Sequence, residues 1–413
     1  MKGILVVIDG MGDLPNSQLK DKTPLESANM PNASFLASRG ELGYMYTVKP
    51  GFVPESDEAI VSIFGNELIS STRGQLEARG TDIKLVRGDL ALRANFATID
   101  SFREGNIIDR RAGRTLTTNE AEILAKALNK IKLPVQFTFK ATVGHRGALV
   151  FKGGFSDNIS GNDTTYVEGK TVIKNKISTC KPLDEEENSQ YSANAVNLFL
   201  EKAFEVLNNH PINEERKKKG LLPANFLLVR GAGIEVPKIK QYKKWVSAAY
   251  MPLEIGFSKV AGMKTYSFEY PKLKSIDVYA NLYEGLVKAC KFSIWVLRKN
   301  RKKADYAYIH IKETDLPGHD GRALDKKKML EYIDKTLFNF LRKFAPPNKV
   351  KVVITADHCT PCRNKAHSAD PVPVLLYNFQ IPKEKKFNES ECRKGTLGRI
   401  EGKELLKKVG FLK

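Results

Sequence analysis

Short apolar runs recur along the chain and predict buried strands. They cover residues 4–8, 226–230, 306–311 and 350–355, and most contain β-branched side chains. Between the last two runs, apolar residues from 324 to 344 recur at helical spacing, and residues 277–299 form a second long helical pattern. Strand–helix–strand order of this kind predicts an α/β fold with a parallel-rich sheet flanked by helices.

The middle of the chain has a different pattern. Alternating apolar and polar positions predict strands at residues 90–97, 135–142 and 147–151. A helical pattern follows at residues 192–207. We therefore predict an inserted α+β domain over residues 67–235, and a discontinuous core formed by residues 1–66 and 236–413.

Composition narrows the classes of partner. The chain has 413 residues with 67 Lys and Arg against 47 Asp and Glu, a net charge of +20. This charge suits an anionic partner, although a lysine-rich proteome or a hot habitat would produce it too. The basic clusters are short and poor in aromatic residues, so we expect a small-molecule substrate and no nucleic acid. A homo-oligomer is compatible with the sequence.

Two further features bear on location. No window approaches 18 unbroken apolar residues, so no membrane-spanning helix is expected. Five cysteines, an odd number in a large chain, argue against a disulfide framework. Both features favour a cytoplasmic protein without membrane contact.

Acidic and imidazole groups follow the ends of three predicted strands. The carboxyl ends of parallel strands meet at one rim of a sheet, where ligands bind. Six potential metal ligands are expected at this rim: Asp9, Asp315, His319, Asp357, His358 and His367. Taken singly, such an aspartate is more often a helix cap, and such a histidine is more often structural.

Local spacing makes two further predictions. Pro317 and Gly318 lie between Asp315 and His319, which favours a turn over a regular helix. Asp357 and His358 are adjacent, so their side chains should point apart in extended chain. That arrangement suits two neighbouring ions, or one ion with a supporting residue.

Electrostatics indicates the number of ions. Three aspartates at one site would repel each other, and one divalent ion would leave the site anionic. Two ions bring the site close to neutrality and allow a phosphate to bind. Nitrogen and oxygen ligands without thiolate favour Mn²⁺, with Mg²⁺, Co²⁺ or Zn²⁺ as alternatives.

Ser56 is the candidate nucleophile. It precedes a predicted helix at residues 57–64, and a helix N-terminus stabilises phosphate through free N–H groups. A bound metal ion could activate its hydroxyl without a dedicated base. The alternative is an ordinary helix cap, because Glu58 follows two residues later.

Two weaker motifs complete the candidate chemistry. Cys359 and Cys362 form a single CxxC, which we interpret as buried thiols beside the metal loop rather than a zinc or redox site. Arg110, Arg111 and Arg114 form a compact group that could bind carboxylate or phosphate, or could lie in a solvated loop.

Motifs along nearly the whole chain resemble one family. They include IDGMGD, TPLESANMPN, SDEAIVSIFG, RGQLEARG, GDLALRANFATID, IDRRAGR, IKETDLPGHDG and DHCTPC followed by AHSADPVPV. Together they resemble the archaeal type of cofactor-independent phosphoglycerate mutase, in the alkaline phosphatase superfamily. The metal-loop motifs are shared across that superfamily, whereas the motifs of the middle region are more specific to this mutase.

The resemblance implies an alkaline-phosphatase-like core interrupted by a substrate-binding domain. It implies interconversion of 3-phosphoglycerate and 2-phosphoglycerate through a phosphoserine at Ser56. One metal ion would be held by Asp9, Ser56, Asp357 and His358, and a second by Asp315, His319 and His367. Candidates for holding the substrate are Arg111, Arg114, His145, Arg146 and Arg230. The alternative function is a metal-dependent phosphatase or another phosphomutase on the same core.

The chain departs from the family pattern at two positions. Glu55 stands where relatives commonly carry glycine before the nucleophile, and an extra carboxylate there should weaken phosphate binding unless it points away. Ile255 stands where relatives carry a lysine that would neutralise the transferring phosphoryl group. Lys259 is the candidate to replace that lysine.

Overall fold

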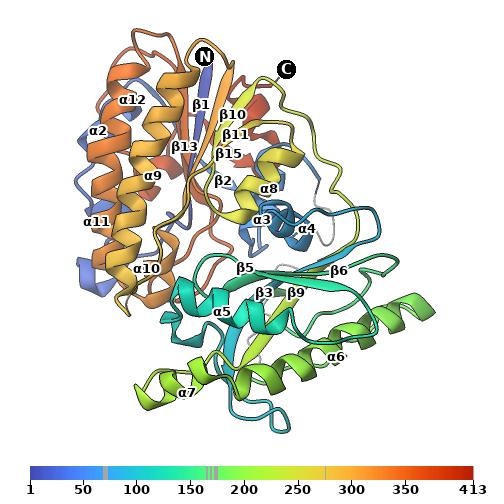
Figure 1. Ribbon diagram of the computed structural model, residues 1–413. Coiled ribbons are helices and arrows are strands. Elements are labelled where there is room, and N and C mark those ends of the chain that lie inside the picture. The colour runs from blue at the N-terminus through green and yellow to red at the C-terminus, as the bar shows by residue number, and fades with distance from the viewer. Residues whose placement is uncertain (68–72, 164–165, 168–169, 172–174, 275, 413) are drawn as a thin grey trace.

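The chain forms a large mixed sheet and a smaller antiparallel sheet (Figure 1). The computed structural model describes residues 1–67, 73–163, 166–167, 170–171, 175–274 and 276–412. The eight strands of the large sheet, in spatial order, are β11 (Lys264–Tyr266), β10 (Trp245–Ala248), β12 (Tyr306–Ile311), β1 (Gly3–Ile8), β13 (Lys351–Thr355), β14 (Val372–Tyr377), β2 (Gly40–Tyr46) and β15 (Gly398–Glu401). Among these described strands only β14 runs against its neighbours, which confirms the predicted parallel-rich α/β sheet.

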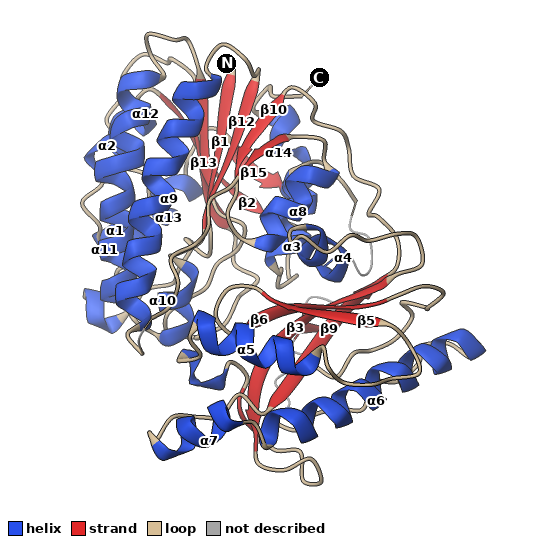
Figure 2. Cartoon of the chain, viewed as in Figure 1, coloured by secondary structure: helices blue, strands red, loops and turns tan. Residues whose placement is uncertain are grey.

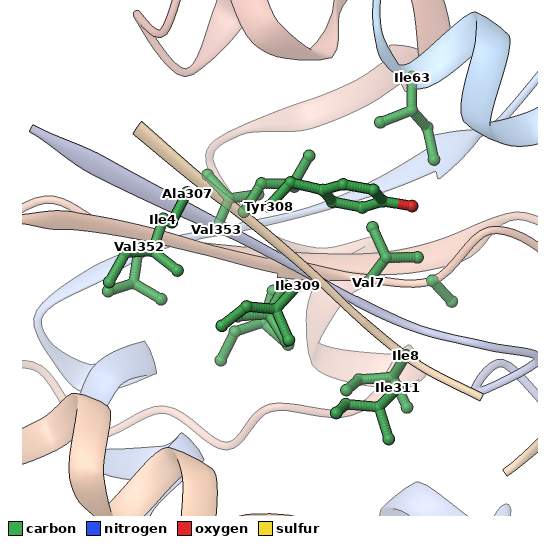
Figure 3. Close-up of a cluster of buried hydrophobic side chains, with 14 of the residues drawn as sticks. Ile4, Val7, Ile8, Ile63, Ala307, Tyr308, Ile309, Ile311, Val352 and Val353 are labelled. Atoms are coloured by element: carbon green, nitrogen blue, oxygen red, sulfur yellow. The ribbon is translucent and has the colours of Figure 1, made fainter. Parts of the chain in front are cut away.

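The three strands that precede the predicted ligands lie side by side. β1 pairs in parallel with β12 on one side and with β13 on the other. Every residue of β1 is buried, as expected for a strand covered on both faces. In Figure 3, Tyr308 of β12 lies on the same side of the sheet as Ile63, whereas Ile309 points to the opposite side.

Helices cover both faces of the large sheet (Figures 1 and 2). α2, α9, α11 and α12 lie together on one side, and α3, α4 and α8 lie between the large sheet and the smaller one. The helices outside the smaller unit are α1 (Pro24–Ser27), α2 (Pro31–Ser38), α3 (Ser56–Ile63), α4 (Arg73–Arg79), α8 (Pro252–Val260), α9 (Val278–Asn300), α10 (Asp315–Asp320), α11 (Ala323–Ile333), α12 (Asn339–Phe344), α13 (Glu389–Arg393) and α14 (Leu405–Lys408). A π-helical segment, Asp334–Phe338, joins α11 to α12, so the pattern predicted over residues 324–344 is one continuous helical rod.

The smaller unit has its own core. Its strands are β3 (Leu90–Ile99), β4 (Ile107–Asp109), β5 (Phe137–Ala141), β6 (Arg146–Phe151) and β9 (Phe226–Gly233), with a separate two-stranded pair, β7 (Tyr166–Val167) and β8 (Lys170–Thr171). Its helices are α5 (Thr118–Leu128), α6 (Glu187–Asn208) and α7 (Pro211–Lys218). Buried side chains from Leu90 to Ala232 form a hydrophobic cluster separate from that of the large sheet. The boundaries predicted at residues 66/67 and 235/236 stay a prediction.

Two sequence expectations change in this unit. The run at residues 226–230 resembles the parallel strands in composition, yet β9 pairs antiparallel with β3. It is buried because α6 packs against it. α6 begins five residues before the predicted start, at Glu187, because its first turn is polar and carries no apolar periodicity.

The contact between α4 and α8 requires two glycines. A Cβ added at Gly256 would lie 1.9 Å from the carbonyl oxygen of Leu76, and one added at Gly80 would lie 1.8 Å from that of Pro252. Such distances are possible only where no side chain intervenes. The two helices are therefore locked at a fixed separation beside the nucleophile helix α3.

We predict that Gly256→Ala destabilises the protein by about 1–3 kcal/mol, because the added methyl group forces α4 and α8 apart. Urea unfolding measures the change. Lys259→Ala, an exposed substitution on the same helix, should stay within about 0.5 kcal/mol of the native chain. Equal stability of the two variants would contradict the close helix contact.

Candidate functional site

The candidate site lies at the carboxyl end of β1, β12 and β13. Asp9 follows β1, and Asp357 and His358 follow β13; all three side chains are buried. Because these strands are adjacent and parallel, their ends converge at one rim, as predicted.

Asp357 and His358 converge, so the expectation that they point apart is wrong. The chain bends at Asp357 and is no longer extended there. The Oδ1 atom of Asp357 accepts hydrogen bonds from the backbone N–H groups of Gly10 and His358, each at 3.0 Å. Its Oδ2 atom then lies 3.3 Å from Nε2 of His358, and that Nε2 lies 3.3 Å from Oδ1 of Asp9.

Asp315, His319 and His367 form a second cluster. Nε2 of His319 lies 3.5 Å from Oδ2 of Asp315, and Nε2 of His367 lies 3.7 Å from its Oδ1. Each imidazole Nδ1 faces a backbone carbonyl oxygen, that of Lys365 for His319 at 3.1 Å and that of Pro54 for His367 at 2.9 Å. Nδ1 donors to these carbonyls fix the tautomer that leaves Nε2 available to a metal ion.

The predicted turn between Asp315 and His319 is instead the short helix α10. Pro317 falls in its first turn, where no backbone N–H is needed for a helical hydrogen bond. The helix places Asp315 and His319 four residues apart on one face, which brings the carboxylate and the imidazole together.

Ser56 contacts the first cluster through His358. Its Oγ is 3.3 Å from Nε2 of His358, and the residue is 8% exposed. The capping residue of α3 is Glu55, which forms a capping box with Glu58. Ser56 is therefore the first helical residue rather than a cap, and its hydroxyl faces the metal-ligand candidates.

Glu55 lines the same cavity as Ser56, and its carboxylate is paired with arginines. Its carboxylate lies 2.7 Å from Arg230 and 2.5 Å from Arg73, and Arg73 also lies 2.9 Å from Asp57. Burial alone would raise the pKa of Glu55, but Arg230 and Arg73 hold it well below its usual value. The charge that could repel a phosphate is thus compensated inside the protein.

Arginines line the cavity above Ser56. The cavity has a volume of about 220 Å³ and contains Asp9, Ser56, Asp315, His319 and His367 in its wall. All five predicted substrate residues also line it: Arg111, Arg114, His145, Arg146 and Arg230. Arg110 lies there as well and pairs with Asp163, while Arg114 pairs with Asp320. The structure therefore brings the candidate substrate residues to the same cavity as Ser56.

Several residues in the cavity or beside it were missed from the sequence. Arg93 of β3 contributes a buried guanidinium group and Arg73 of α4 a partly buried one, and Lys312 lies just after β12. His310 occupies the fifth position of β12 and is buried beside Asp9 and Asp357. The sequence does hold one signal for two of them: His310 and Lys312 stand two residues apart at the end of an otherwise apolar run.

Lys312, not Lys259, supplies the ammonium group of the site. Its Nζ contacts Asp9 and lies 2.8 Å from Glu254. Burial opposes its charge, but these carboxylates raise the pKa of Lys312 above its usual value. Lys259 is exposed and donates to the carbonyl of Arg79, and Ile255 lines a separate hollow. The expectation that Lys259 replaces the family lysine is therefore wrong.

The CxxC cysteines are buried thiols, as predicted. Cys359 and Cys362 are free and lie in the loop after β13. Burial raises the pKa of Cys362 to about 12, so it stays a thiol at neutral pH. Beneath this loop a buried ion pair joins Lys326 to Asp13 at 2.7 Å, and Asp13 accepts the backbone N–H of Cys362.

The donor chemistry of the site fits divalent ions. Two groups of three side chains have ligand atoms within 4.8 Å of one another: Asp315, His358 and His367, and Asp9, His310 and Asp357. Buried polar atoms in the second group lack hydrogen-bond partners, among them Oδ1 of Asp9 and Oδ2 of Asp357. An ion would satisfy atoms that no protein group satisfies.

In the described residues no helix has the length and apolarity to cross a membrane.

This fold and donor set define a metal-dependent enzyme. The Metalloenzyme superfamily model matches residues 263–411, and the model described as 2,3-bisphosphoglycerate-independent phosphoglycerate mutase matches residues 37–213. A mutase of that description from Archaeoglobus fulgidus is 38% identical, covering 98% of this chain and 96% of the relative, and one from Thermococcus kodakarensis is 37% identical, covering 98% and 95%. The chain belongs to the 2,3-bisphosphoglycerate-independent phosphoglycerate mutases, of the archaeal type, as the sequence motifs predicted.

Solved structures agree with this assignment. The PH0037 protein from Pyrococcus horikoshii is similar with a TM-score of 0.76 at 28% identity, over 100% of this chain and 98% of that one. A cofactor-independent phosphoglycerate mutase from Thermoplasma acidophilum is similar with a TM-score of 0.56 at 29% identity, over the full length of both chains. The likeness therefore extends across both sheets.

Protons should compete with metal at only some of these ligands. Burial lowers the pKa of His358 to about 3 and that of His319 to about 4, so neither holds a proton at pH 5. Burial, and then the charge of Asp9, raises the pKa of Asp357 to about 6. Burial alone would lower the pKa of His367, but Asp315 raises it above its usual value.

We predict that loading the site at pH 5 releases protons from Asp357 and His367, and that this release declines as pH rises. Metal affinity should accordingly fall as pH is lowered through 6. Calorimetry of Mn²⁺ binding in buffers of different ionisation enthalpy measures the released protons. A proton release that does not decline between pH 5 and pH 8 contradicts the raised pKa values of Asp357 and His367.

Proposed function

We propose that this chain interconverts 3-phosphoglycerate and 2-phosphoglycerate through a phosphoserine at Ser56, with two divalent ions bound. The observation that carries the proposal is the position of Oγ of Ser56, 3.3 Å from Nε2 of His358, in a cavity wall that also holds Asp9 and Asp315. A cytoplasmic location and a homo-oligomer stay predictions.

The candidate ligands divide into two sets. Asp9, Ser56, Asp357 and His358 would hold one ion, and Asp315, His319 and His367 the other. The imidazole of His358 stacks on that of His367 with ring centroids 3.7 Å apart, so His358 lies at the boundary between the sets. Mn²⁺ suits these donors best, with Mg²⁺, Co²⁺ and Zn²⁺ as alternatives. Bound ions would lower the pKa of the serine hydroxyl and neutralise phosphoryl oxygens.

Ser56 then exchanges the phosphoryl group. A bond forms between its Oγ and phosphorus as the bond from phosphorus to the substrate oxygen breaks; the serine gives up its proton, the leaving oxygen takes one up, and the glycerate stays in the cavity. The second glycerate hydroxyl reverses the transfer after the glycerate reorients. The first backbone N–H groups of α3 are positioned to stabilise negative charge beside Ser56.

The arginines hold the glycerate and limit hydrolysis. Arg111, Arg114, Arg146 and Arg230, with His145, line the cavity and would bind the substrate carboxylate. The ammonium group of Lys312 is held beside Asp9, where it can neutralise the phosphoryl group. The smaller unit, closing over Ser56, would exclude water that otherwise hydrolyses the phosphoserine.

The alternative is a metal-dependent phosphatase or another phosphomutase of the same superfamily. A phosphatase would use the same Ser56 and the same metal ligands. The two functions differ only in whether the phosphoryl group passes to water or to a substrate hydroxyl. The rate of phosphate release against the rate of 2-phosphoglycerate formation from 3-phosphoglycerate distinguishes the two.

We predict that Ser56 carries one phosphate after incubation with 3-phosphoglycerate and Mn²⁺, as read by peptide mass spectrometry. Ser56→Ala should remove the phosphate and lower kcat by about 10⁴-fold or more. Ser62→Ala, on the same helix, is the matched control and should retain both the phosphate on Ser56 and the native kcat. Full activity of Ser56→Ala would end the phosphoserine proposal.

We predict that Lys312→Met lowers kcat by about 10²-fold, because one charge beside the phosphoryl group is lost. Metal binding should persist, since Lys312 competes with the ion for Asp9 rather than assisting it. Lys259→Met is the control and should have native activity. A Lys312→Met variant with native kcat would show that this ammonium group is not needed.

A further inference from the structure

We propose that His310 is a further ligand of the ion held by Asp9 and Asp357, and that Tyr308 orients it. This rests on the proposed two-ion site, and it adds a donor that the motif-based ligand set lacks. The expected consequence is a site that prefers Mn²⁺ over Mg²⁺.

The position of His310 places its ring against both carboxylates. The residue is 1% exposed and pairs with Val7 of β1 in the middle of the sheet. Its Nε2 lies 3.7 Å from Oδ2 of Asp9 and 3.6 Å from Oδ2 of Asp357. These atoms come from three adjacent strands, so the arrangement is built into the rigid part of the fold.

The separations suit coordination and not hydrogen bonding. A nitrogen and an oxygen 3.6–3.7 Å apart do not form a hydrogen bond. Two donors that each bind an ion at about 2.1 Å are separated by about this distance. Nε2 of His310 and Oδ2 of Asp357 are buried without a hydrogen-bond partner, which is costly, and a cation between them would remove that cost.

Tyr308 is placed to support the tautomer that coordination needs. Its hydroxyl lies 2.7 Å from Nδ1 of His310. When Nδ1 donates to that hydroxyl, the lone pair of Nε2 faces the carboxylates, an orientation that is favourable only with a cation present. Tyr308 is itself held by aromatic contacts with Phe64 and Phe257.

A second imidazole on this ion changes its selectivity. With His358 and His310 both bound, the ion has two nitrogen ligands in addition to the carboxylates. Mg²⁺ prefers oxygen and accepts nitrogen poorly, whereas Mn²⁺, Co²⁺ and Zn²⁺ accept both. His310 would therefore help exclude Mg²⁺ from this position.

The test compares His310→Asn with His210→Asn in the full chain. His210 caps α7 in the smaller unit, where its Nδ1 accepts the backbone N–H of Ile212, and asparagine also caps helices well. Calorimetric titration with Mn²⁺ and with Mg²⁺ gives the affinity of each ion. We expect His310→Asn to weaken one Mn²⁺ at least tenfold while changing Mg²⁺ less, and His210→Asn to match the native chain.

Two further measurements test the proposal even where His310→Asn fails to fold. Tyr308→Phe keeps the ligand but removes its partner, and should weaken the same Mn²⁺ by a smaller factor. In the native chain labelled with ¹⁵N-histidine, Zn²⁺ should shift Nε2 of four histidines, namely His310, His319, His358 and His367. Three shifted histidines, or a folded His310→Asn with native affinity for both ions, would overturn the proposal.

The outcome is separable from that of the proposed function. If the native chain forms phosphoserine and 2-phosphoglycerate but only three histidines bind metal, His310 is a supporting residue and the mutase proposal stands. If four histidines bind metal but no isomer forms, the ligand assignment stands and the proposed reaction does not.

Discussion

Buried negative charge at the ends of three parallel strands is the constraint on which this structure depends. Asp9 and Asp357 are almost completely removed from water, and Asp315 lies close by. Such carboxylates are unfavourable unless positive charge compensates them. Lys312, the imidazoles and the bound ions we propose supply that compensation. The carboxylates that are costly to bury therefore gather the positive charge that a phosphate needs.

The sequence predicted the centre of the large sheet and most of the metal-ligand candidates, because both have local signals. β1, β12 and β13 are continuous apolar runs, and Asp9, Asp315 and Asp357 follow their ends. β2, β10, β11, β14 and β15 were not predicted, since several are only three or four residues long and β2 joins the sheet far from its neighbours in sequence. Their positions depend on long-range pairing.

Site residues that lack a local signal depend on tertiary packing. Arg73 reaches Glu55 because α4 packs on α8 through glycines, and Arg93 faces the cavity because β3 pairs with β9. Glu55 looked unfavourable in the sequence, where its arginine partners could not be seen. His310 lies within an apolar run that is typical of plain core, and Lys312 directly follows that run. Local sequence patterns predicted the candidate metal ligands, whereas the side chains that compensate the buried charges could be found only in the folded structure.

The short edge strands of the large sheet limit how copies of this chain can associate. β11 has three residues and β15 has four, and each edge carries an exposed basic side chain, Lys264 or Arg399. Short, charged edges resist the addition of a strand from another molecule. Sheets of neighbouring chains should therefore not merge into a continuous one.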